Sequence, residues 1–534
     1  MISYHYKNRK AMIEFEIYSF KFMPLTKGMI VKMRKAIKRG LVVALGVIIQ
    51  ILLSLSVLIF FGQKIAIIES FYSILSVLLV LGIIKESKSL SKDLPWIIII
   101  MLFPIVGALL YVVIGGNLHK SKVLKAIKQS EENGSKYFVQ DEKIKKEIEQ
   151  QNNGKINYLM NYLNFPVTKN NDIKYYSLGD TAYIDMIKEL KNAKKFIFLE
   201  YFIIKNGKMW SEILKILEEK ANEGLDVRLI YDDMGCIAFL PETYPKKMEK
   251  KKIKCIAFNK LNPFLGVIMN NRDHRKMMII DGKTVFSGGM NLADEYINLE
   301  HPYGEWKDNG IKITGDAVWN FTVMFLNMWN SYRKDDKDYK IFKHDFTNEN
   351  IPENGYTIPY GETPLDSEIV GENVYLNIIN QARKYVYIFT PYLIIDTDMI
   401  NSLILAAKRG VDVRIVVPGI PDKKIVYSLT TSYFETLIKN GVKIYKYMPG
   451  FVHSKVFVSD DNIATVGSIN LDYRSLYLHF ECGVFMQDVD VIKDVKKDLI
   501  DTIDKSHLVS KKEATPKFFK GVWQAILRLF APLM

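Results

Sequence analysis

Residues 271–291 read NRDHRKMMIIDGKTVFSGGMN, and this stretch organises the rest of the chain. It contains His274, Lys276 and Asp281 in an H-x-K-x4-D pattern, followed by two glycines and Asn291. The same pattern returns in HSKVFVSDDNIATVGSIN, residues 453–470, as His453, Lys455, Asp460 and Asn470. Each copy joins an apolar run typical of a strand to a turn, so the context repeats together with the motif. We therefore interpret the two stretches as one duplicated functional site.

The residue types in this motif suit the transfer of a phosphoryl group. A neutral imidazole can attack phosphorus and hold the group covalently, which divides one displacement into two easier steps. A second imidazole can protonate the leaving alkoxide and then deprotonate the incoming alcohol, because its unperturbed pKa of about 6.5 makes both forms available near neutrality. The lysines and asparagines can donate hydrogen bonds to the phosphate oxygens where charge gathers. These donors supply a positive field, so we expect no metal ion and no cofactor.

The two stretches resemble the paired HKD motifs of the phospholipase D superfamily, and their flanks resemble the bacterial cardiolipin synthases more narrowly. The flanks are DHRKMMIIDGKTVFSGGMNLADEY and GEWKDNGIKITG in the first half, and TPYLIIDTDM and HSKVFVSDDNIATVGSINLDYRSLYLHFE in the second. The resemblance extends from about Glu69 to the C-terminus. It departs from the usual pattern at Asp273 and His479, where Asn is usual, and at Lys307, where Arg is usual.

The resemblance implies an enzyme of the bacterial cell membrane that makes cardiolipin and glycerol from two molecules of phosphatidylglycerol. The reaction would pass through a phosphatidyl–histidine intermediate, with His274 as the nucleophile and His453 as the general acid and base; the exchanged roles stay open. A hydrolase of the phospholipase D type and a transferase with another acceptor are the alternatives within the superfamily. Anionic membrane lipid is the implied partner, and the sequence leaves the oligomeric state and the lipid chain preference open.

Two acids, Asp308 and Glu481, follow the glycine-rich turns of the two motifs. In the superfamily, acids at such positions bond to a catalytic histidine, and a catalytic imidazole needs a partner that orients its other nitrogen. We therefore expect both acids to support the histidines. His479 lies close to Glu481 in the sequence, and we interpret it as a neighbour of the site.

The turns themselves contain further candidates. Gly289 can let the backbone approach a phosphate, and the hydroxyl group of Ser468 can donate a hydrogen bond to it. Although Asp281 and Asp460 belong to the motif, we expect them to fix their turns by bonding backbone amides rather than to take part in the chemistry.

The charge distribution favours a membrane over a nucleic acid as the partner. The 534-residue chain carries a formal net charge of +14, and residues 1–40 hold ten Lys or Arg against two Glu, a net of +8. A basic segment beside apolar spans is typical of attraction to anionic lipid, whereas a nuclease needs a basic stripe along its substrate. A membrane-tethered nuclease is therefore the less favoured alternative. The cysteines, Cys236, Cys255 and Cys482, have no metal-ligand spacing and predict no disulfide framework.

Apolar stretches predict a multi-pass membrane anchor within residues 41–115, because each is about long enough to span a bilayer. They are Leu41–Phe61, Ile65–Ile84 and Trp96–Ile114, and the last contains Pro104. The second and third match the usual two-helix anchor of the family. The basic N-terminus predicts a cytoplasmic start, but lysines also follow the third stretch, so the side of the membrane that carries the catalytic units stays open.

An internal repeat predicts two tandem phospholipase D-like α/β/α units with mixed sheets. KFIFLEYFII (195–204) and GLDVRLIYDD (224–233) flank a helical pattern, and KYVYIFTPYLII (384–395) and GVDVRIVVPG (410–419) flank another. Apolar strands that alternate with helices are typical of a sheet covered on both faces. We expect the two units to face each other and to bring His274 and His453 to one cleft.

The expected domain order places these units between an anchor and a C-terminal helix. It is a basic segment (1–40), an anchor with two or three helices (41–115), a charged helical stalk (116–170), the first unit (171–332), a connection rich in Asp, Asn, Pro and Gly (333–368), the second unit (369–510) and an amphipathic helix (511–534). For the last segment, an interfacial membrane helix and a helix docked on the catalytic units are equally favoured.

Overall fold

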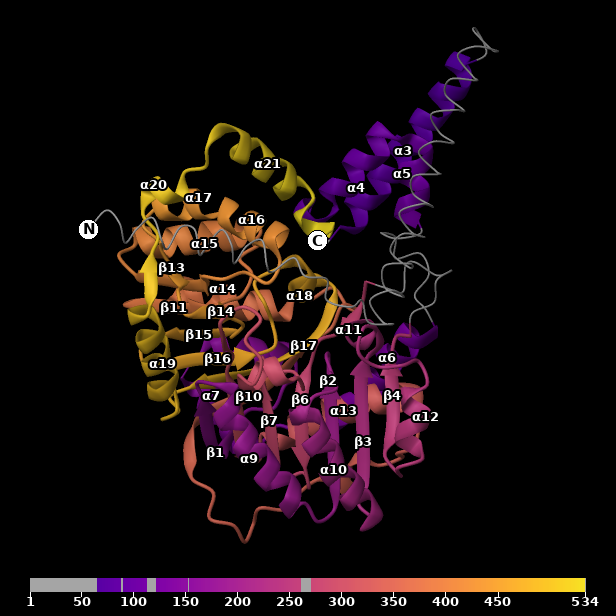
Figure 1. Ribbon diagram of the computed structural model, residues 1–534, viewed down its shortest axis with the longest axis vertical. Helices are drawn as coiled ribbons and strands as arrows, with labels where there is room; N and C mark the ends of the chain where they lie inside the picture. The colour runs from indigo at the N-terminus through magenta and orange to yellow at the C-terminus, as the bar shows by residue number, and fades with distance from the viewer. Residues whose placement is uncertain (1–64, 88–89, 113–121, 152, 261–269, 534) are drawn as a thin grey trace, which may run out of the picture.

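The computed structural model describes residues 65–87, 90–112, 122–151, 153–260 and 270–533. The basic segment 1–40 and the first apolar stretch, Leu41–Phe61, lie outside these residues. The two motif-bearing halves lie side by side and form the body of the molecule, and three apolar helices project from it (Figure 1).

The first half is a mixed sheet with helices on both faces, as the repeat predicted. Parallel strands β3, β2 and β4 continue through antiparallel β6, β7 and β9, in the order β4-β3-β2-β6-β7-β9. The residues of β2, β6 and β7 are all buried, which explains why these strands read as continuous apolar runs. The elements are α9 (Gly179–Asn192), β2 (Phe196–Tyr201), α10 (Lys208–Asn222), β3 (Asp226–Asp232), α11 (Asp233–Cys236), α12 (Tyr244–Glu249), β4 (Lys254–Phe258), β6 (Lys276–Ile280), β7 (Thr284–Gly288), β9 (Gly310–Gly315) and α13 (Val318–Tyr332).

The second half repeats this plan, with the order β18-β13-β12-β11-β15-β16-β17. In both halves a glycine ends the helix of the repeat, and Gly224 and Gly410 adopt φ values of +97° and +91° that glycine tolerates best. The elements are α14 (Val370–Gln381), β11 (Tyr385–Phe389), α15 (Thr397–Lys408), β12 (Asp412–Pro418), α16 (Lys424–Ser432), α17 (Phe434–Lys439), β13 (Lys443–Tyr447), β15 (Val456–Ser459), β16 (Ile463–Gly467), α18 (Tyr473–Tyr477), β17 (His479–Gln487), α19 (Ile492–Asp504) and β18 (Ser506–Leu508).

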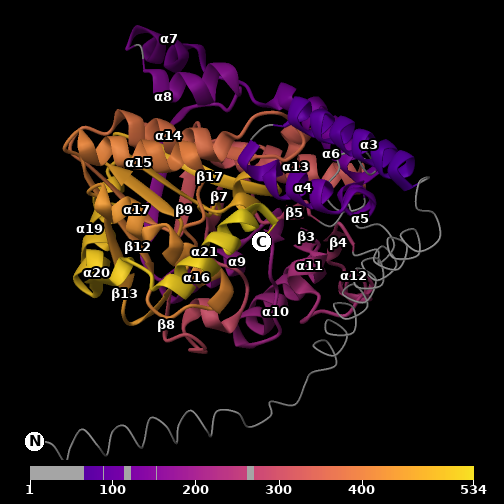
Figure 2. The same cartoon turned by 90° about the horizontal axis from the view of Figure 1, so that it is seen from above.

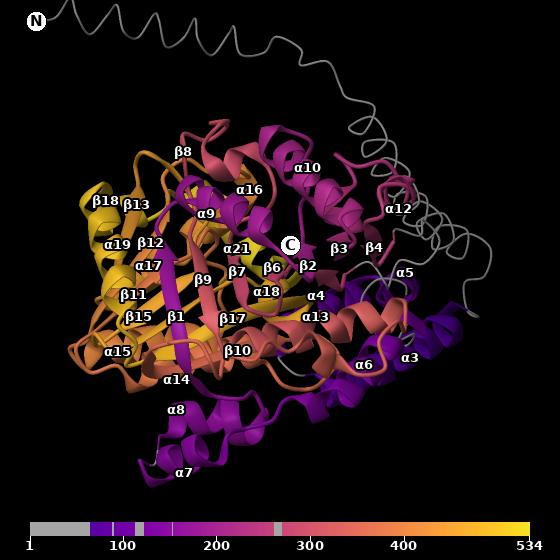
Figure 3. The same cartoon turned by 90° about the horizontal axis from the view of Figure 1, so that it is seen from below.

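The two half-sheets join into one continuous sheet through β1 (Thr168–Tyr176) and β10 (Glu353–Glu362). β1 pairs antiparallel with both β9 and β10, and β10 pairs antiparallel with β17 (Figure 3). The expectation that residues 333–368 form only a connection is therefore wrong for β10, which lies in the middle of the sheet. Its Pro359 and two glycines are turn and edge signals in a sequence, and they hid the strand.

The segment after the expected anchor is helical, as predicted. Part of it packs against the first half and is not a free stalk. Its helices are α6 (Lys122–Gly134) and α7 (Glu142–Gln150). α6 packs along α13 and buries Leu124 and Ile127. A Cβ added to Gly134 would lie 1.8 Å from the amide oxygen of Asn327, so the two helices are in close contact. This contact fixes the start of the first half against the C-terminal helix of the same half.

The apolar helices of the expected anchor are α3 (Ile65–Glu86), α4 (Leu90–Leu102) and α5 (Pro104–Leu110). The expectation of one helix across Trp96–Ile114 is wrong, because the chain turns back at Pro104 and the ring of Trp96 contacts that of Tyr111 at 5.7 Å. Proline lacks the N–H and clashes with the preceding turn, which explains the break. Among the helices that the structure describes, we find none with both the length and the apolarity that a membrane crossing requires.

The C-terminal helix α21 (Phe518–Leu529) is docked on the second half by one face. It packs against α16, and its Gln524 and Leu527 are buried there. The last turn, η7 (Ala531–Leu533), reaches α4, so the C-terminus lies between the catalytic body and the apolar helices (Figure 2). Of the two expected placements of this helix, docking on the catalytic units is therefore confirmed for the face that contacts α16.

Candidate active site

Two short strand pairs cross between the halves and place both histidines in one site. The strands are β5 (Arg272–Asp273), which pairs with the start of β17, and β8 (Glu305–Lys307), which pairs with β14 (Gly450–Val452). The amide N–H of His274 donates to the carbonyl oxygen of Phe480 at 2.9 Å, and that of His453 donates to the carbonyl oxygen of Lys307 at 2.8 Å. Each motif is therefore held by the backbone of the opposite half.

Each histidine is also bonded to a carboxylate of the opposite half. Nδ1 of His274 lies 2.8 and 2.9 Å from the two carboxylate oxygens of Glu481, and Nδ1 of His453 lies 2.6 Å from Oδ2 of Asp308. Both carboxylates are completely buried. Because Nδ1 is engaged in both rings, Nε2 is the nitrogen that can act on a substrate. The acids lie where they can orient the histidines, as expected, but the exchange between halves was not predicted.

The motif lysines are buried cations that bond to backbone rather than to carboxylates. Nζ of Lys276 donates to the carbonyl oxygen of His274, and Nζ of Lys455 donates to that of His453. In the described part of the chain, neither ammonium group forms a salt bridge. Burial lowers the pKa of Lys276 to about 8 and that of Lys455 to about 7, although the nearby carboxylates oppose the shift. An anion between the two lysines would favour their charged forms.

The electrostatics of the site keep both imidazoles neutral at pH 7 before a substrate binds. Burial, and then the charges of Lys276 and Lys455, lower the pKa of His274 well below its usual value. Burial and Lys455 lower the pKa of His453 to about 4, and Asp308 partly offsets this shift. A phosphodiester would bring a negative charge between the lysines and raise the pKa of both histidines. The site can therefore present a neutral nucleophile and acquire a proton with its substrate.

The carboxylate of Asp308 is held in its ionised form. Burial works against ionisation, but the interaction and hydrogen bond with His453, followed by the charge of Lys455, lower the pKa of Asp308 overall. Its other oxygen accepts a hydrogen bond from the backbone N–H of Asn309 at 2.9 Å. A buried carboxylate of this kind stabilises an imidazolium at His453.

The glycine-rich turns support the carboxylates, a role that the sequence did not predict for Gly289 and Ser468. A Cβ added to Gly289 would lie 2.1 Å from Oδ1 of Asp308, so only glycine leaves room for this acid. At the matching position of the second half, Oγ of Ser468 donates a hydrogen bond to Oε2 of Glu481. Each turn is thus fitted to the acid of its own half.

The motif asparagines hold loops and keep one amide hydrogen for a ligand. Oδ1 of Asn291 accepts from the N–H of Ile203 at 3.0 Å, and its Nδ2 donates to the hydroxyl of Tyr296 at 2.7 Å. Nδ2 of Asn470 donates to Oγ of Ser475 at 3.1 Å. An amide NH₂ has two hydrogens, so, among the described residues, each group has one hydrogen left for a ligand.

The motif aspartates are structural and lie outside the catalytic group. Asp281 accepts hydrogen bonds from three successive backbone N–H groups at 194–196, and Asp460 does the same at 383–385, all at 2.7–3.0 Å. The expectation that they bond backbone amides is confirmed, but the amides belong to the starts of β2 and β11 rather than to their own turns. Each aspartate therefore fixes the register between its motif strand and the neighbouring strand.

Aromatic rings enclose the histidines. The ring of His453 lies 5.4 Å from that of Tyr296, 5.6 Å from that of Trp306 and 5.9 Å from that of Phe451. The ring of His274 lies 4.8 Å from that of Phe202. Both histidines are only 7% exposed. Sequence reasoning missed these rings; the position of Trp306, two residues before Asp308, was the available signal, because residues i and i+2 share a strand face.

His479, two residues before Glu481, lies beside His274, as Trp306, two residues before Asp308, lies beside His453. The rings of His479 and His274 lie 5.5 Å apart, and Nδ1 of His479 is 3.7 Å from Glu481. Burial lowers the pKa of His479 to about 3, so it is a neutral neighbour, as interpreted from the sequence. Ligand-type atoms of His274, His479 and Glu481 lie within 4.8 Å of one another. A divalent cation there would be repelled by the charges of Lys276 and Lys455.

The other two residues that depart from the family pattern, Lys307 and Asp273, are buried next to charged partners. Nζ of Lys307 is paired with both carboxylate oxygens of Asp498 at 2.7 and 2.8 Å. Asp273 is buried beside Glu200 and Arg275, and burial raises its pKa to about 6. The three cysteines are free and buried.

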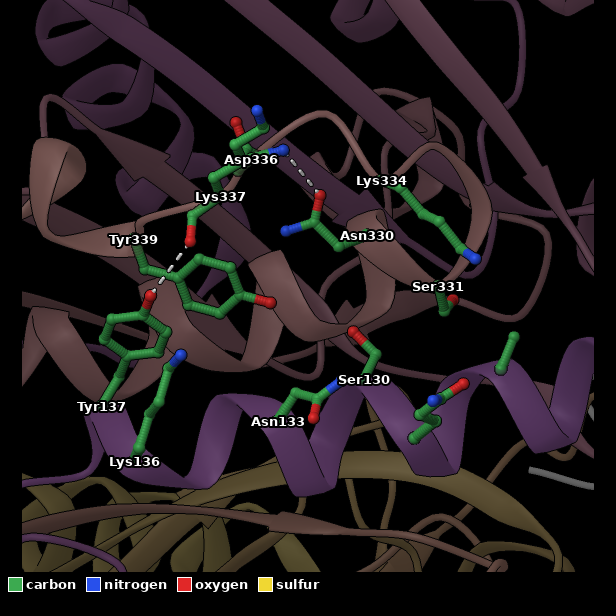
Figure 4. A pocket seen from close by; sticks show the side chains of 12 residues that line it. Ser130, Asn133, Lys136, Tyr137, Asn330, Ser331, Lys334, Asp336, Lys337 and Tyr339 are labelled. Carbon is green, nitrogen blue, oxygen red and sulfur yellow. Dashed lines mark hydrogen bonds between the residues drawn. The ribbon is translucent and has the colours of Figure 1, made fainter.

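A polar pocket of about 350 Å³ lies between α6 and the segment that follows α13 (Figure 4). Ser130 and Lys136 line one side of it, and Asn330, Lys334 and Tyr339 line the other. The pocket shares no residue with the motifs, so it is separate from the histidine site.

Fold and site together define a class of protein: two tandem phospholipase D-like units that exchange acids and share one pair of His–Lys motifs. A family model described as "Cardiolipin synthase, PLD-like domain" matches residues 186–329 and 375–502, and one described as "Phospholipase_D-nuclease N-terminal" matches residues 74–116. Among solved structures, a phosphatidylserine synthase from Haemophilus influenzae has a TM-score of 0.54 at 18% identity and covers 71% of this chain and 98% of its own. This likeness supports the fold alone.

Relatives by sequence identify the family more narrowly than this structural likeness does. A cardiolipin synthase of Clostridium perfringens is 32% identical over 479 residues, 84% of this chain and 95% of its own length. One of Staphylococcus aureus is 31% identical and covers 85% of this chain and 93% of its own length. An uncharacterized protein of Streptococcus mutans is 44% identical and covers 85% and 99%. The chain belongs to the cardiolipin synthase family of the phospholipase D superfamily, and the expected resemblance is confirmed.

Proposed function

We propose that this chain is a phosphatidyltransferase that makes one cardiolipin and one glycerol from two molecules of phosphatidylglycerol. The family membership supports this activity. The observation that carries it is the reciprocal pairing of His274 with Glu481 and of His453 with Asp308. This pairing provides two oriented imidazoles, and Lys276 and Lys455 provide unpaired positive charge for the phosphodiester between them.

In the first half of the reaction, Nε2 of His274 attacks the phosphorus of one phosphatidylglycerol. The bond between phosphorus and the terminal glycerol oxygen breaks, and the imidazolium of His453 gives its proton to that oxygen, so glycerol leaves. Lys276, Lys455 and the free amide hydrogens of the motif asparagines stabilise the charge on the non-bridging oxygens. The product of this step is a phosphatidyl–histidine and a neutral His453.

In the second half, the glycerol hydroxyl of another phosphatidylglycerol attacks the phosphorus. Its proton passes to Nε2 of His453, the bond between phosphorus and His274 breaks, and cardiolipin leaves. His453 is the better candidate for the acid and base, because its bond to the ionised Asp308 is the shorter of the two pairs and stabilises the imidazolium. His274, whose bond to its acid is the longer of the two, is therefore assigned as the nucleophile.

Transfer instead of hydrolysis requires that water compete poorly with the lipid hydroxyl. The two histidines are buried, and aromatic rings surround them. An enclosed apolar site disfavours bulk water at the phosphorus. This enclosure supports the transferase over a hydrolase that uses the same residues.

The enzyme acts at the bacterial cell membrane, held there by a multi-pass anchor. The N-terminal family model covers α3 to α5, and α3 exposes Phe71, Ile74 and Leu78 by at least 60% each. Exposed apolar area costs roughly 25 cal/mol per Å² in water, so this surface suits lipid.

The test is a product analysis in mixed micelles with labelled phosphatidylglycerol as the only lipid substrate. Cardiolipin and glycerol in equal amounts are expected, and His274→Ala and His453→Ala should each abolish both products. Phosphatidic acid instead of cardiolipin would make water the acceptor and put the hydrolase first. DNA cleavage without lipid turnover would favour the nuclease.

A further inference from the structure

The C-terminal helix α21 exposes its apolar face, the reverse of a helix in a water-soluble domain. Phe519, Val522, Trp523 and Ile526 follow a helical spacing and point outward, with exposed fractions of 85% for Phe519 and 49% for Trp523. Phe518, at the start of the helix, is also exposed. A contiguous apolar surface of this kind marks a contact with a partner or a membrane.

The inner face of α21 is fixed by polar contacts, so the outward direction of the apolar face is built into the fold. Nε2 of Gln524 donates to the carbonyl oxygen of Ser428 and to Oγ1 of Thr431, both at 3.0 Å. The guanidinium of Arg528 lies 4.6 Å from the ring centre of Tyr433. Rotation of the helix to hide its aromatic residues would break these contacts.

Positive charge borders the apolar face. Lys511, Lys512, Lys517 and Lys520 are all exposed on α21 or just before it. The acid in this segment, Glu513, is occupied by His507 and by the cap of α20 (Lys511–Ala514). An apolar face with a lysine border is complementary to a membrane surface that carries anionic lipid.

The segments that contact α21 and its last turn also carry apolar residues. At its C-terminal end, η7 contacts α4 of the apolar helices. Ile425 is exposed on α16, the helix on which α21 rests, and Ile420 is exposed just before that helix begins. The N–H of Ile420 donates to the carbonyl oxygen of Gly450, three residues before His453. Contacts of α21 and its last turn thus lead to the apolar helices on one side and to the segment that carries a motif histidine on the other.

We propose that the outer face of α21 lies in the interface of an anionic lipid bilayer and forms a second membrane contact of the catalytic body, in addition to the N-terminal helices. This contact holds the body close to the lipid surface. The proposal concerns a surface and does not depend on which lipid reaction the site performs. A second copy of the chain could bury the same apolar face, but it would make no use of the lysines around it. Anionic lipid uses both features and is therefore the favoured occupant.

The test places an environment-sensitive fluorophore on the full-length protein through Trp523→Cys, and a matched one through Ile184→Cys. Ile184 is an exposed apolar residue on α9, at the opposite end of the body in Figure 1, and the native cysteines are buried. In vesicles of phosphatidylcholine and phosphatidylglycerol with nitroxide-labelled lipid, the label at 523 should be strongly quenched and the label at 184 should not. Equal quenching of the two labels would overturn the proposal. So would a signal at 523 that follows protein concentration but ignores the quencher, because a second copy would then cover this face.

Activity gives an independent readout. The double variant Phe519→Ser/Trp523→Ser should lower kcat/KM on vesicle phosphatidylglycerol by about ten-fold or more and leave turnover of a short-chain, water-soluble phosphatidylglycerol unchanged. Lys517→Gln and Lys520→Gln should each cost about five-fold on anionic vesicles, because a lysine near such a surface contributes about 1 kcal/mol. An equal loss on vesicle and soluble substrate, or no loss on either, would contradict the membrane role.

Discussion

The exchange of acids between the halves predicts a specific defect for Asp308→Asn. Oδ2 of Asp308 lies 2.6 Å from Nδ1 of His453, and the carboxylate is completely buried. A hydrogen bond to a charged group contributes about 1.5–3 kcal/mol. Loss of the negative charge should therefore lower the pKa of His453 in the substrate complex by about 1–2 units, and kcat near neutral pH should fall by about 10- to 150-fold.

The sign of the pH effect separates this explanation from a general loss of structure. The acid step needs the imidazolium form of His453, which is present below its pKa and lost above it, so the fall of kcat with rising pH should begin about 1–2 units lower in the variant. The assay is kcat for cardiolipin formation in mixed micelles across pH. Asp294→Asn is the matched control: Asp294 is also buried but caps α10 through the N–H groups of Lys208 and Met209, so it should lower Tm without moving the profile. An unchanged profile in Asp308→Asn, or a loss of the same size at every pH, would refute the reasoning.

Three further predictions follow from the same geometry. In the free enzyme, kcat/KM should fall as pH rises through about 7 to 8, because Lys276 and Lys455 lose their protons there; a flat kcat/KM profile up to pH 9 would contradict the role of their charges. Gly289→Ala should lower kcat by about 100-fold, since its Cβ would displace the carboxylate of Asp308, whereas Gly154→Ala, with open space around the site of the Cβ, should be neutral in the same assay. Ser468→Ala should lower kcat by about five-fold through the loss of a hydrogen bond of about 1 kcal/mol to Glu481; wild-type kcat would show that this bond does not position the acid.

The sequence was informative about the elements that repeat. The His–Lys–Asn set occurs twice at matching spacing, each time with flanking apolar strands. The repeat therefore predicted two α/β units and one shared site. The residues that bond to the histidines were also found, because Asp308 and Glu481 each fall on a strand-like run behind a glycine-rich turn, where the superfamily carries such an acid.

The connections between the halves were not predictable in the same way. β5, β8 and β14 are two or three residues long, too short to show a periodic pattern, yet they decide which acid reaches which histidine. β10 was hidden because Pro359, Gly355 and Gly361 are ordinary turn residues, although the strand lies in the middle of the sheet. The requirement for Gly289 depends on the position of Asp308 in space, which the chain order does not reveal.

The aromatic enclosure of the site has the same origin. Tyr296, Trp306 and Phe451 come from both halves and meet only around the ring of His453. Aromatic residues are frequent in buried cores, so none of them stood out in the sequence as part of a site. Their contribution became visible when the paired strands brought them to the same histidine.

In the proposed reaction, His274 carries the phosphatidyl group while His453 moves the proton. The most direct test of these roles is rapid mixing of the enzyme with phosphatidylglycerol labelled in the phosphate, followed by quenching at alkaline pH and mass spectrometry of the peptides. We predict a transient phosphatidyl group on the peptide that contains His274, absent in His274→Ala, with no label on the peptide that contains His453. Label on His453 would exchange the two roles, and full cardiolipin synthesis by His274→Ala would contradict the mechanism.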